Sequence, residues 1–238
     1  MNKSELFKSR EQRILAAALT TARSKGALDF RMADVARVAE CSVGTLYGHF
    51  LSKEDMMAAL VQVALERRQL WFQQVKEMPL SAVERVVVLL LSERTRLVQD
   101  EVLAQLEMLV NFSELWRRAA DQRQIALRNA VNELSGVLHE VLTAAVDAGE
   151  VVLDAEQIDS LAERCRALML GFQMQASRQT LAPAKVLRDD AVMMDALVET
   201  LMSAGLAQPG EQWQHRCVEA LAHSDLQLDS PLLADDAA

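Results

Sequence analysis

CSVGTLYGHFLSKEDM, residues 41–56, is the stretch that decides the fold of this 238-residue chain. Its apolar side chains recur at the i, i+3, i+4 and i+7 spacing of one helix face; they are Val43, Leu46, Tyr47 and Phe50. Ser42 precedes them as a helix N-cap, and Ser52 with Asp55 resembles a capping box that starts another helix. Gly44 and Gly48 weaken a helix, so their presence needs a reason other than helix stability.

Two more helices are predicted immediately before this stretch. Residues 10–25 carry apolar side chains on one helix face and end at Gly26, a suitable C-cap. Residues 32–39 repeat the same spacing, and a three-residue turn, ECS, leads into the glycine-bearing helix. A helix followed by two short helices with a tight turn between them is the layout of a helix-turn-helix module, although other three-helix clusters share this periodicity.

The remainder of the chain also has a helical pattern. Glycine and proline number only 8 and 4, and aromatic residues make up 4%, which favours an all-α protein over one rich in sheet. Ser81 with Glu84 and Asp154 with Gln157 mark two further helix starts. Beyond residue 52, helices are expected at about 53–78, 82–99, 101–110, 113–148, 155–181, 187–204 and 211–225. The Val/Leu run at 86–91 alone would also fit a buried strand, but its cap favours a helix.

Charge is unevenly distributed along the chain. Residues 1–53 contain nine Lys/Arg and five Asp/Glu, a net charge of +4, whereas the remaining residues carry −13. A basic front end on an acidic body suggests a local contact with a polyanion, although chance asymmetry would also produce it. The three cysteines form no CxxC pair and indicate reduced thiols, and no apolar run is long enough for a membrane span. We therefore expect a cytoplasmic protein with no membrane partner.

Several side chains of the decisive stretch suit contact with DNA. Gly44 would let the helix backbone approach a groove wall, and Ser42 and Thr45 are short hydroxyl donors for phosphates or base edges. Lys53 stands at a helix N-terminus, where a positive charge is unfavourable unless an anion is bound there. A solvated surface lysine is the alternative interpretation of this position.

VARVAECSVGTLYGHFLSKEDMMAAL, residues 35–60, closely resembles the DNA-binding signature of the TetR (tetracycline-repressor-like) family of bacterial transcription regulators. The resemblance covers about residues 10–60. It implies that Tyr47, His49 and Lys53 contact phosphates; because Tyr47 and His49 lie among apolar residues in sequence, half-buried positions are the alternative for these two. It also implies that the major groove is faced by Val43, Gly44, Thr45 and Gly48.

The chain departs from the family pattern at three positions. Glu40 occupies a turn position where glycine is common, so left-handed backbone strain is expected there. Arg31 replaces a frequent capping Ser or Thr, which removes the cap and offers an arginine to phosphate. Gly48 replaces a larger side chain that touches bases in relatives, so the operator sequence cannot be inferred.

The resemblance further implies a second, larger helical domain for ligand binding and dimerisation. We expect residues 1–55 to be the helix-turn-helix domain, 56–207 the second domain, and 208–238 a C-terminal helix with an acidic tail. The helices at 155–181 and 187–204 are apolar on two sides, so one side can pack in the chain's own core and the other against a second copy. A larger monomeric bundle is the alternative.

An unidentified small, apolar or amphipathic effector would bind in this second domain. Its candidate contacts are large apolar side chains and two polar anchors, although most such residues are ordinary core. They are Trp71, Glu107, Met108, Asn111, Phe112, Trp116, Met169, Phe172 and Met174.

No enzyme, metal or cofactor signature stands out in the sequence. HEVLT, residues 139–143, lacks the last histidine of a zinc-protease motif, and no P-loop, GxGxxG or GxSxG occurs. We therefore expect no catalysis, no cofactor and no metal. The prediction is a ligand-responsive regulator, a repressor in the family's common mode, that binds an operator as a homodimer; a helical adaptor protein is the alternative.

Overall fold

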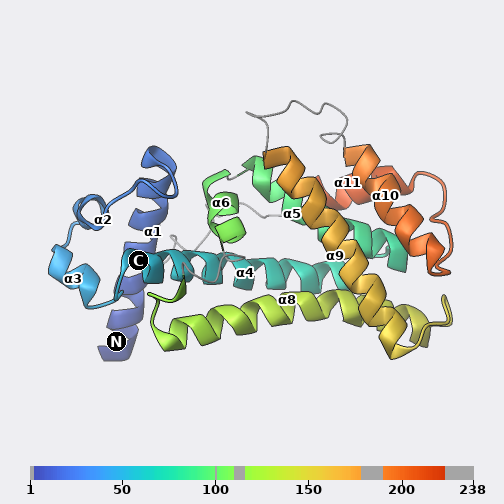
Figure 1. The fold of residues 1–238 in the computed structure, drawn as a ribbon, viewed down its shortest axis with the longest axis horizontal. Coiled ribbons are helices and arrows are strands. Elements are labelled where there is room, and N and C mark those ends of the chain that lie inside the picture. Colours follow the sequence, from blue (N-terminus) through green and yellow to red (C-terminus); the bar gives the residue numbers. More distant parts are fainter. Residues whose placement is uncertain (1–2, 100, 110–115, 178–189, 223–238) are drawn as a thin grey trace. The chain divides into compact units, whose positions relative to one another are not determined.

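The computed structural model describes residues 3–99, 101–109, 116–177 and 190–222, and Figure 1 shows helices joined by turns throughout them. The all-α prediction is confirmed. The helices are α1 (Lys3–Lys25), α2 (Met32–Val38), α3 (Val43–Tyr47), α4 (Lys53–Glu77), α5 (Ala82–Gln99), α6 (Glu101–Leu109), α8 (Asp121–Asp147), α9 (Ala155–Ser177), α10 (Asp190–Ser203) and α11 (Trp213–Ala222). No helix in these ranges is both long and apolar enough to cross a membrane.

The described residues divide into two compact units. Unit 1 takes its residues from 3–68 and 97–132, and unit 2 takes its residues from 69–96 and 133–222. The helices α4, α5 and α8 contribute residues to both. The domain limits expected from the sequence stay a prediction, because compact packing does not establish where an independently folding domain begins.

Unit 1 is built around the helix-turn-helix. The helix α1 packs against α2 and α6, and α2 packs against α3. The apolar side chains Ile14 of α1, Val35 of α2, Leu46 of α3 and Phe50 are all buried and form its core. This core fixes the orientation of the short helix α3, which has too few residues to be stable alone.

Unit 2 contains the buried run of α5 and the packed pair α9 and α10. The capping box at the start of α5 forms as predicted, since Ser81 N donates to the Glu84 carboxylate at 2.8 Å and Glu84 N donates to Ser81 Oγ at 3.3 Å. Arg216 of α11 donates to the same carboxylate from Nε at 2.8 Å. A charged, buried side chain therefore joins α11 to α5.

Local signals located several other helix ends correctly. Asp154 and Gln157 bond to each other's backbone N–H at the start of α9, at 2.8 and 2.9 Å. Gly26, Gly149 and Gly205 all have positive φ after a helix, as a C-cap requires.

The predicted helix over 113–148 was wrong at its N-terminal end. Residues 117–119 form a turn and α8 begins at Asp121; residues 113–115 lie outside the described chain. The turn is held by contacts with the start of α4: Ser52 Oγ donates to Arg118 O at 2.9 Å, and Ala120 N donates to Asp55 Oδ1 at 3.2 Å. Helical periodicity continues through 117–120, but these two hydrogen bonds stabilise a different backbone.

Candidate nucleic-acid interface

The turn before α3 has the strain that the sequence predicts. Glu40 has φ of 51°, the left-handed region that glycine adopts without cost. The turn closes with a hydrogen bond from Cys41 N to Ala36 O at 2.9 Å. Ser42 then caps α3 by accepting from Thr45 N at 3.0 Å, and its hydroxyl lies 2.9 Å from the Thr45 hydroxyl. The start of α3 therefore presents two hydroxyl groups that are bonded to each other.

One face of α3 is left uncovered. Ser42, Val43, Gly44, Tyr47 and Gly48 are all exposed, and Tyr47 keeps 52% of its surface accessible. A methyl group on Gly44 would meet only Ser42 Oγ within 4 Å, at 3.6 Å, so nothing in unit 1 requires glycine there. The space that Gly44 leaves is therefore available to something outside the chain. At Gly48, a methyl group would lie 3.2 Å from Thr45 O, so its own backbone disfavours a larger residue.

Arg31 occupies the N-cap position of α2 without a side-chain capping hydrogen bond, as its residue type predicts. Arg31 is exposed, so its guanidinium is accessible to a ligand at the start of α2. Whether it meets phosphate stays a prediction.

Lys53 is the first residue of α4, but its side chain is bonded within unit 1. Its Nζ donates to the carbonyl of Leu28 at 2.5 Å and lies 4.4 Å from the centre of the Phe30 ring. Burial lowers its pKa, against the opposing attraction of Asp29 and Glu54. The predicted phosphate contact would require this side chain to leave Leu28.

His49 follows α3 and is almost completely covered, with 4% of its side chain exposed. Its ring stacks on Phe7 of α1, with centroids 4.0 Å apart, and its buried Nδ1 makes no hydrogen bond. Burial lowers the pKa of His49, an effect that Glu11 opposes and Arg10 supports. In the free chain this imidazole is therefore a packed group, and its predicted role at phosphate stays untested.

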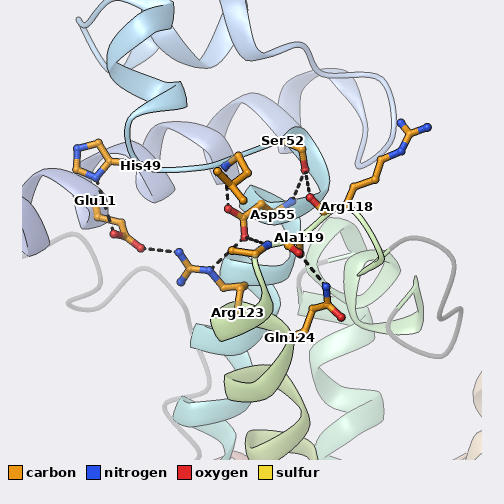
Figure 2. Close-up of polar contacts among 10 residues, drawn as sticks. Glu11, His49, Ser52, Asp55, Arg118, Ala119, Arg123 and Gln124 are labelled. Atoms are coloured by element: carbon orange, nitrogen blue, oxygen red, sulfur yellow. Dashed lines mark hydrogen bonds and ion pairs between the residues drawn. The ribbon is translucent and has the colours of Figure 1, made fainter.

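Behind the exposed face lies a polar cluster that sequence reasoning missed (Figure 2). Arg123 of α8 donates from one terminal nitrogen to Glu11 of α1 at 2.9 Å, and its Nε lies 3.6 Å from Asp55 of α4. The guanidinium also lies over the Phe50 ring, 5.6 Å from its centre. We call the three residues Glu11, Phe50 and Asp55 the Arg123 socket. They belong to three segments far apart in sequence, so no local pattern could have revealed them.

The predicted effector contacts have mixed environments. Trp71, Trp116, Met169 and Phe172 are buried, whereas Glu107 and Met108 are half-buried. Asn111 and Phe112 lie outside the described residues. Met174 was expected to line a pocket, but it is 54% exposed because it lies on a face of α9 that the chain's own core does not cover.

Two polar groups stand out among these side chains. Glu107 forms an ion pair with Arg68 within unit 1 and is therefore not a free anchor. In unit 2, Trp71 is buried and its Nε1 has no hydrogen-bond partner in the described chain. An indole N–H buried in this way loses free energy unless a further acceptor reaches it.

Residues 14–60 match the model of a family described as bacterial regulatory proteins, tetR family. They include α2, α3, the turn between them and the start of α4. No curated protein sequence is significantly similar to the chain.

Several solved structures share the fold of nearly the whole chain. A putative TetR-family transcriptional regulator from Mesorhizobium loti MAFF303099 has a TM-score of 0.61 at 18% identity, covering 85% of this chain and 98% of that one. The transcriptional regulator FadR from Bacillus subtilis, in complex with stearoyl-CoA, has a TM-score of 0.58 at 18% identity, covering 79% and 97%. RolR in complex with resorcinol has a TM-score of 0.58 at 14% identity, covering 93% and 97%.

Proposed function

We propose that this chain, a TetR-family regulator by the match of its residues 14–60 and with the fold of a DNA-binding transcriptional regulator, is a repressor. It binds a pseudo-palindromic operator as a homodimer, and a small apolar or amphipathic effector releases it. It acts in the cytoplasm, where the DNA is, and carries out no catalysis.

The uncovered face of α3 is the observation that carries this proposal. Gly44 and Gly48 leave room for DNA, Tyr47 projects beside them, and Ser42 and Thr45 supply hydroxyls. A recognition helix uses its N-terminal residues to reach base edges while neighbouring side chains hold phosphates. Arg31, Tyr47, His49 and Lys53 are the proposed phosphate contacts. The last two must give up part of their present packing to make them.

The outer stripe of α9 supports a homodimer. The apolar positions predicted from the sequence on both sides of this helix are largely buried in the chain's own core, Ile158, Leu161, Cys165 and Met169 among them. The stripe that remains exposed recurs at i, i+3, i+4 and i+7 and consists of Ala167, Leu170, Gly171 and Met174. A second copy would bury this stripe by a two-fold contact and set two recognition helices for adjacent half-sites. Leu170→Glu should therefore give a monomer in light scattering and weaken operator binding, whereas the exposed Val218→Glu should remain a dimer.

An effector site in the helical part is supported by the unpaired Trp71 Nε1, which an acceptor atom of the ligand would satisfy. The structural relatives bind an acyl-CoA in one case and a small phenol in another, so the fold accommodates different ligands. Quenching of tryptophan fluorescence by candidate ligands, compared between the intact chain and Trp71→Phe, tests this assignment.

Gly44→Ala is the experiment that tests the proposed DNA-binding face. In α3 the added methyl group has space and alanine favours a helix, so the free energy of unfolding should stay the same or rise by up to about 1 kcal/mol. DNA affinity, measured by fluorescence anisotropy on genomic fragments that the protein selects, should nevertheless fall at least about tenfold, as expected for a steric clash in the groove. Gly136→Ala is the matched control, because a methyl group there meets nothing within 4 Å and the residue lies in the part of α8 that belongs to unit 2.

Wild-type affinity should fall steeply with salt, because phosphate contacts release counterions. Absent or salt-independent binding would favour the helical adaptor, and unchanged affinity in Gly44→Ala would exclude α3 as the recognition helix.

A further inference from the structure

Glu11 lies between two cationic or potentially cationic groups from different parts of unit 1 (Figure 2). Its Oε1 accepts from Arg123 at 2.9 Å, while its Oε2 lies 3.8 Å from Nδ1 of His49. The second distance is too long for a hydrogen bond. The carboxylate is therefore committed to Arg123 and only adjacent to His49.

The net charge next to the recognition helix depends on which partner Glu11 has. With Arg123 in the socket, and with His49 taking a proton from solvent as a phosphate anion approaches, the three groups carry a net charge of +1. If Arg123 withdraws, Glu11 and a protonated His49 cancel each other, so the attraction to phosphate is lost. Arg10, also on α1, is the other charged group that acts on His49, and it stays in place in both arrangements.

A movement of α8 would change the contacts of Arg123. Arg123 lies in the first turn of this helix, and its socket is formed by Glu11 of α1, by Phe50 in the segment between α3 and α4, and by Asp55 of α4. Asp55 holds both the amide of Ala120, immediately before α8, and the amide of Leu51, immediately after Phe50. A displacement of the first turn of α8 would thus change contacts to all three elements together.

We propose that Arg123 is a positioning residue for DNA binding: it holds Glu11 away from His49, and displacement of the first turn of α8 withdraws Arg123, lets Glu11 neutralise His49 and weakens DNA binding. This inference rests on the proposed DNA-binding function and adds to it the residues through which α8 acts on the recognition helix.

The test is a rescue experiment. Arg123→Gln should raise the dissociation constant for a selected genomic duplex of about 30 base pairs by about three- to tenfold, the effect of losing one favourable charge near phosphate. Adding Glu11→Gln removes the competing carboxylate and should restore the affinity to within about twofold of wild type. A role confined to structural support predicts the opposite, because the double variant lacks both halves of the ion pair.

Arg118→Gln is the matched control. Arg118 lies in the turn immediately before α8 and forms an exposed ion pair with Glu54 at 3.4 Å. Arg118→Gln therefore removes one positive charge, as Arg123→Gln does, but Glu11 keeps Arg123 as its partner. Adding Glu11→Gln to this variant should bring no comparable rescue. Arg123→Lys keeps a cation that can reach Glu11 and should retain most of the affinity for DNA. If Arg123→Gln unfolds, Arg123→Lys with and without Glu11→Gln replaces it in the test.

An NMR titration of His49 separates failure of this inference from failure of the proposed function, because it needs no DNA. The pKa of His49 should rise in Arg123→Gln and should rise much less when Glu11→Gln is also present. An equal rise in both backgrounds, or a double variant that binds DNA no better than Arg123→Gln, would overturn the inference. Absence of DNA binding by the wild type would contradict only the proposed function.

Discussion

Replacing Asp55 by asparagine tests how strongly the polar cluster supports unit 1. The Asp55 residue is 2% exposed, and its carboxylate accepts from Leu51 N at 2.9 Å and from Ala120 N at 3.2 Å. The same carboxylate lies 3.6 Å from Nε of Arg123. In Asp55→Asn the side-chain NH2 must face one of these donors, so at least one buried N–H loses its acceptor.

The expected cost follows from those contacts. A buried donor left without an acceptor costs about 1–3 kcal/mol, and loss of the charge beside Arg123 adds to this. We therefore expect Asp55→Asn to lower the free energy of unfolding by about 2–4 kcal/mol, a large part of the 5–15 kcal/mol typical of a folded protein. Asp55→Ala removes both acceptors and should cost about 3–5 kcal/mol, as expected when one partner of a buried ion pair is deleted.

Urea unfolding followed by far-ultraviolet circular dichroism measures this loss. A chain with two compact units need not unfold in a single transition, so variants are compared at the transition that Asp55→Asn moves. Asp147→Asn is the control, because it makes the same chemical change at an exposed position in the last turn of α8 and should stay within about 0.5 kcal/mol of wild type. If Asp55→Asn costs no more than this control, the buried cluster contributes nothing to stability and the reasoning is refuted.

Three other predictions concern single residues. Glu40→Gly relieves the left-handed backbone and should stabilise unit 1 by about 1 kcal/mol, seen as a higher urea midpoint; a lower midpoint would contradict the strain. Glu84 is buried, which pushes its pKa upward, but Ser81 and Arg216 hold the pKa below the ordinary value. Its charge should therefore stabilise the fold above about pH 4.5. The difference in free energy of unfolding between the wild type and Glu84→Gln should shrink as the pH falls through the lower pKa of folded Glu84. A difference that does not depend on pH would show that the charge of Glu84 does not stabilise the fold. Lys53→Ala should weaken DNA binding on all sequences and reduce the slope of log affinity against log salt by about 1, whereas an unchanged slope would remove this residue from the phosphate contacts.

The features that could be predicted from sequence are those determined within a few residues. Ser42 caps α3, and Ser81 caps α5 with help from Glu84, because the partners are three residues apart. The left-handed turn at Glu40 and the lost cap at Arg31 follow from residue type at one position. The period of α3 predicts only part of its packing, because Leu46 and Phe50 are buried whereas Val43 and Tyr47, at the same spacing, are exposed.

The features that could not be predicted depend on contacts between distant segments. Glu11 and Arg123 are 112 residues apart, and no periodicity relates them. The start of α8 was misplaced for the same reason, because Ser52 and Asp55 hold the preceding turn across tertiary contacts. The sequence left His49 open between a phosphate contact and a half-buried position, and it could not show that Phe7 of α1, which precedes the helix pattern at 10–25, stacks on the His49 ring.

The bond between Lys53 and the carbonyl of Leu28 has a consequence for backbone dynamics when DNA binds. Leu28 belongs to the short connection between α1 and α2, and this ammonium is one of its ties to α4. A phosphate that captures Lys53 would release that connection at the moment when the rest of the interface becomes ordered. Amide hydrogen exchange should then speed up at residues 28–31 while it slows in α3, so DNA would loosen one loop of the protein as it rigidifies its neighbour.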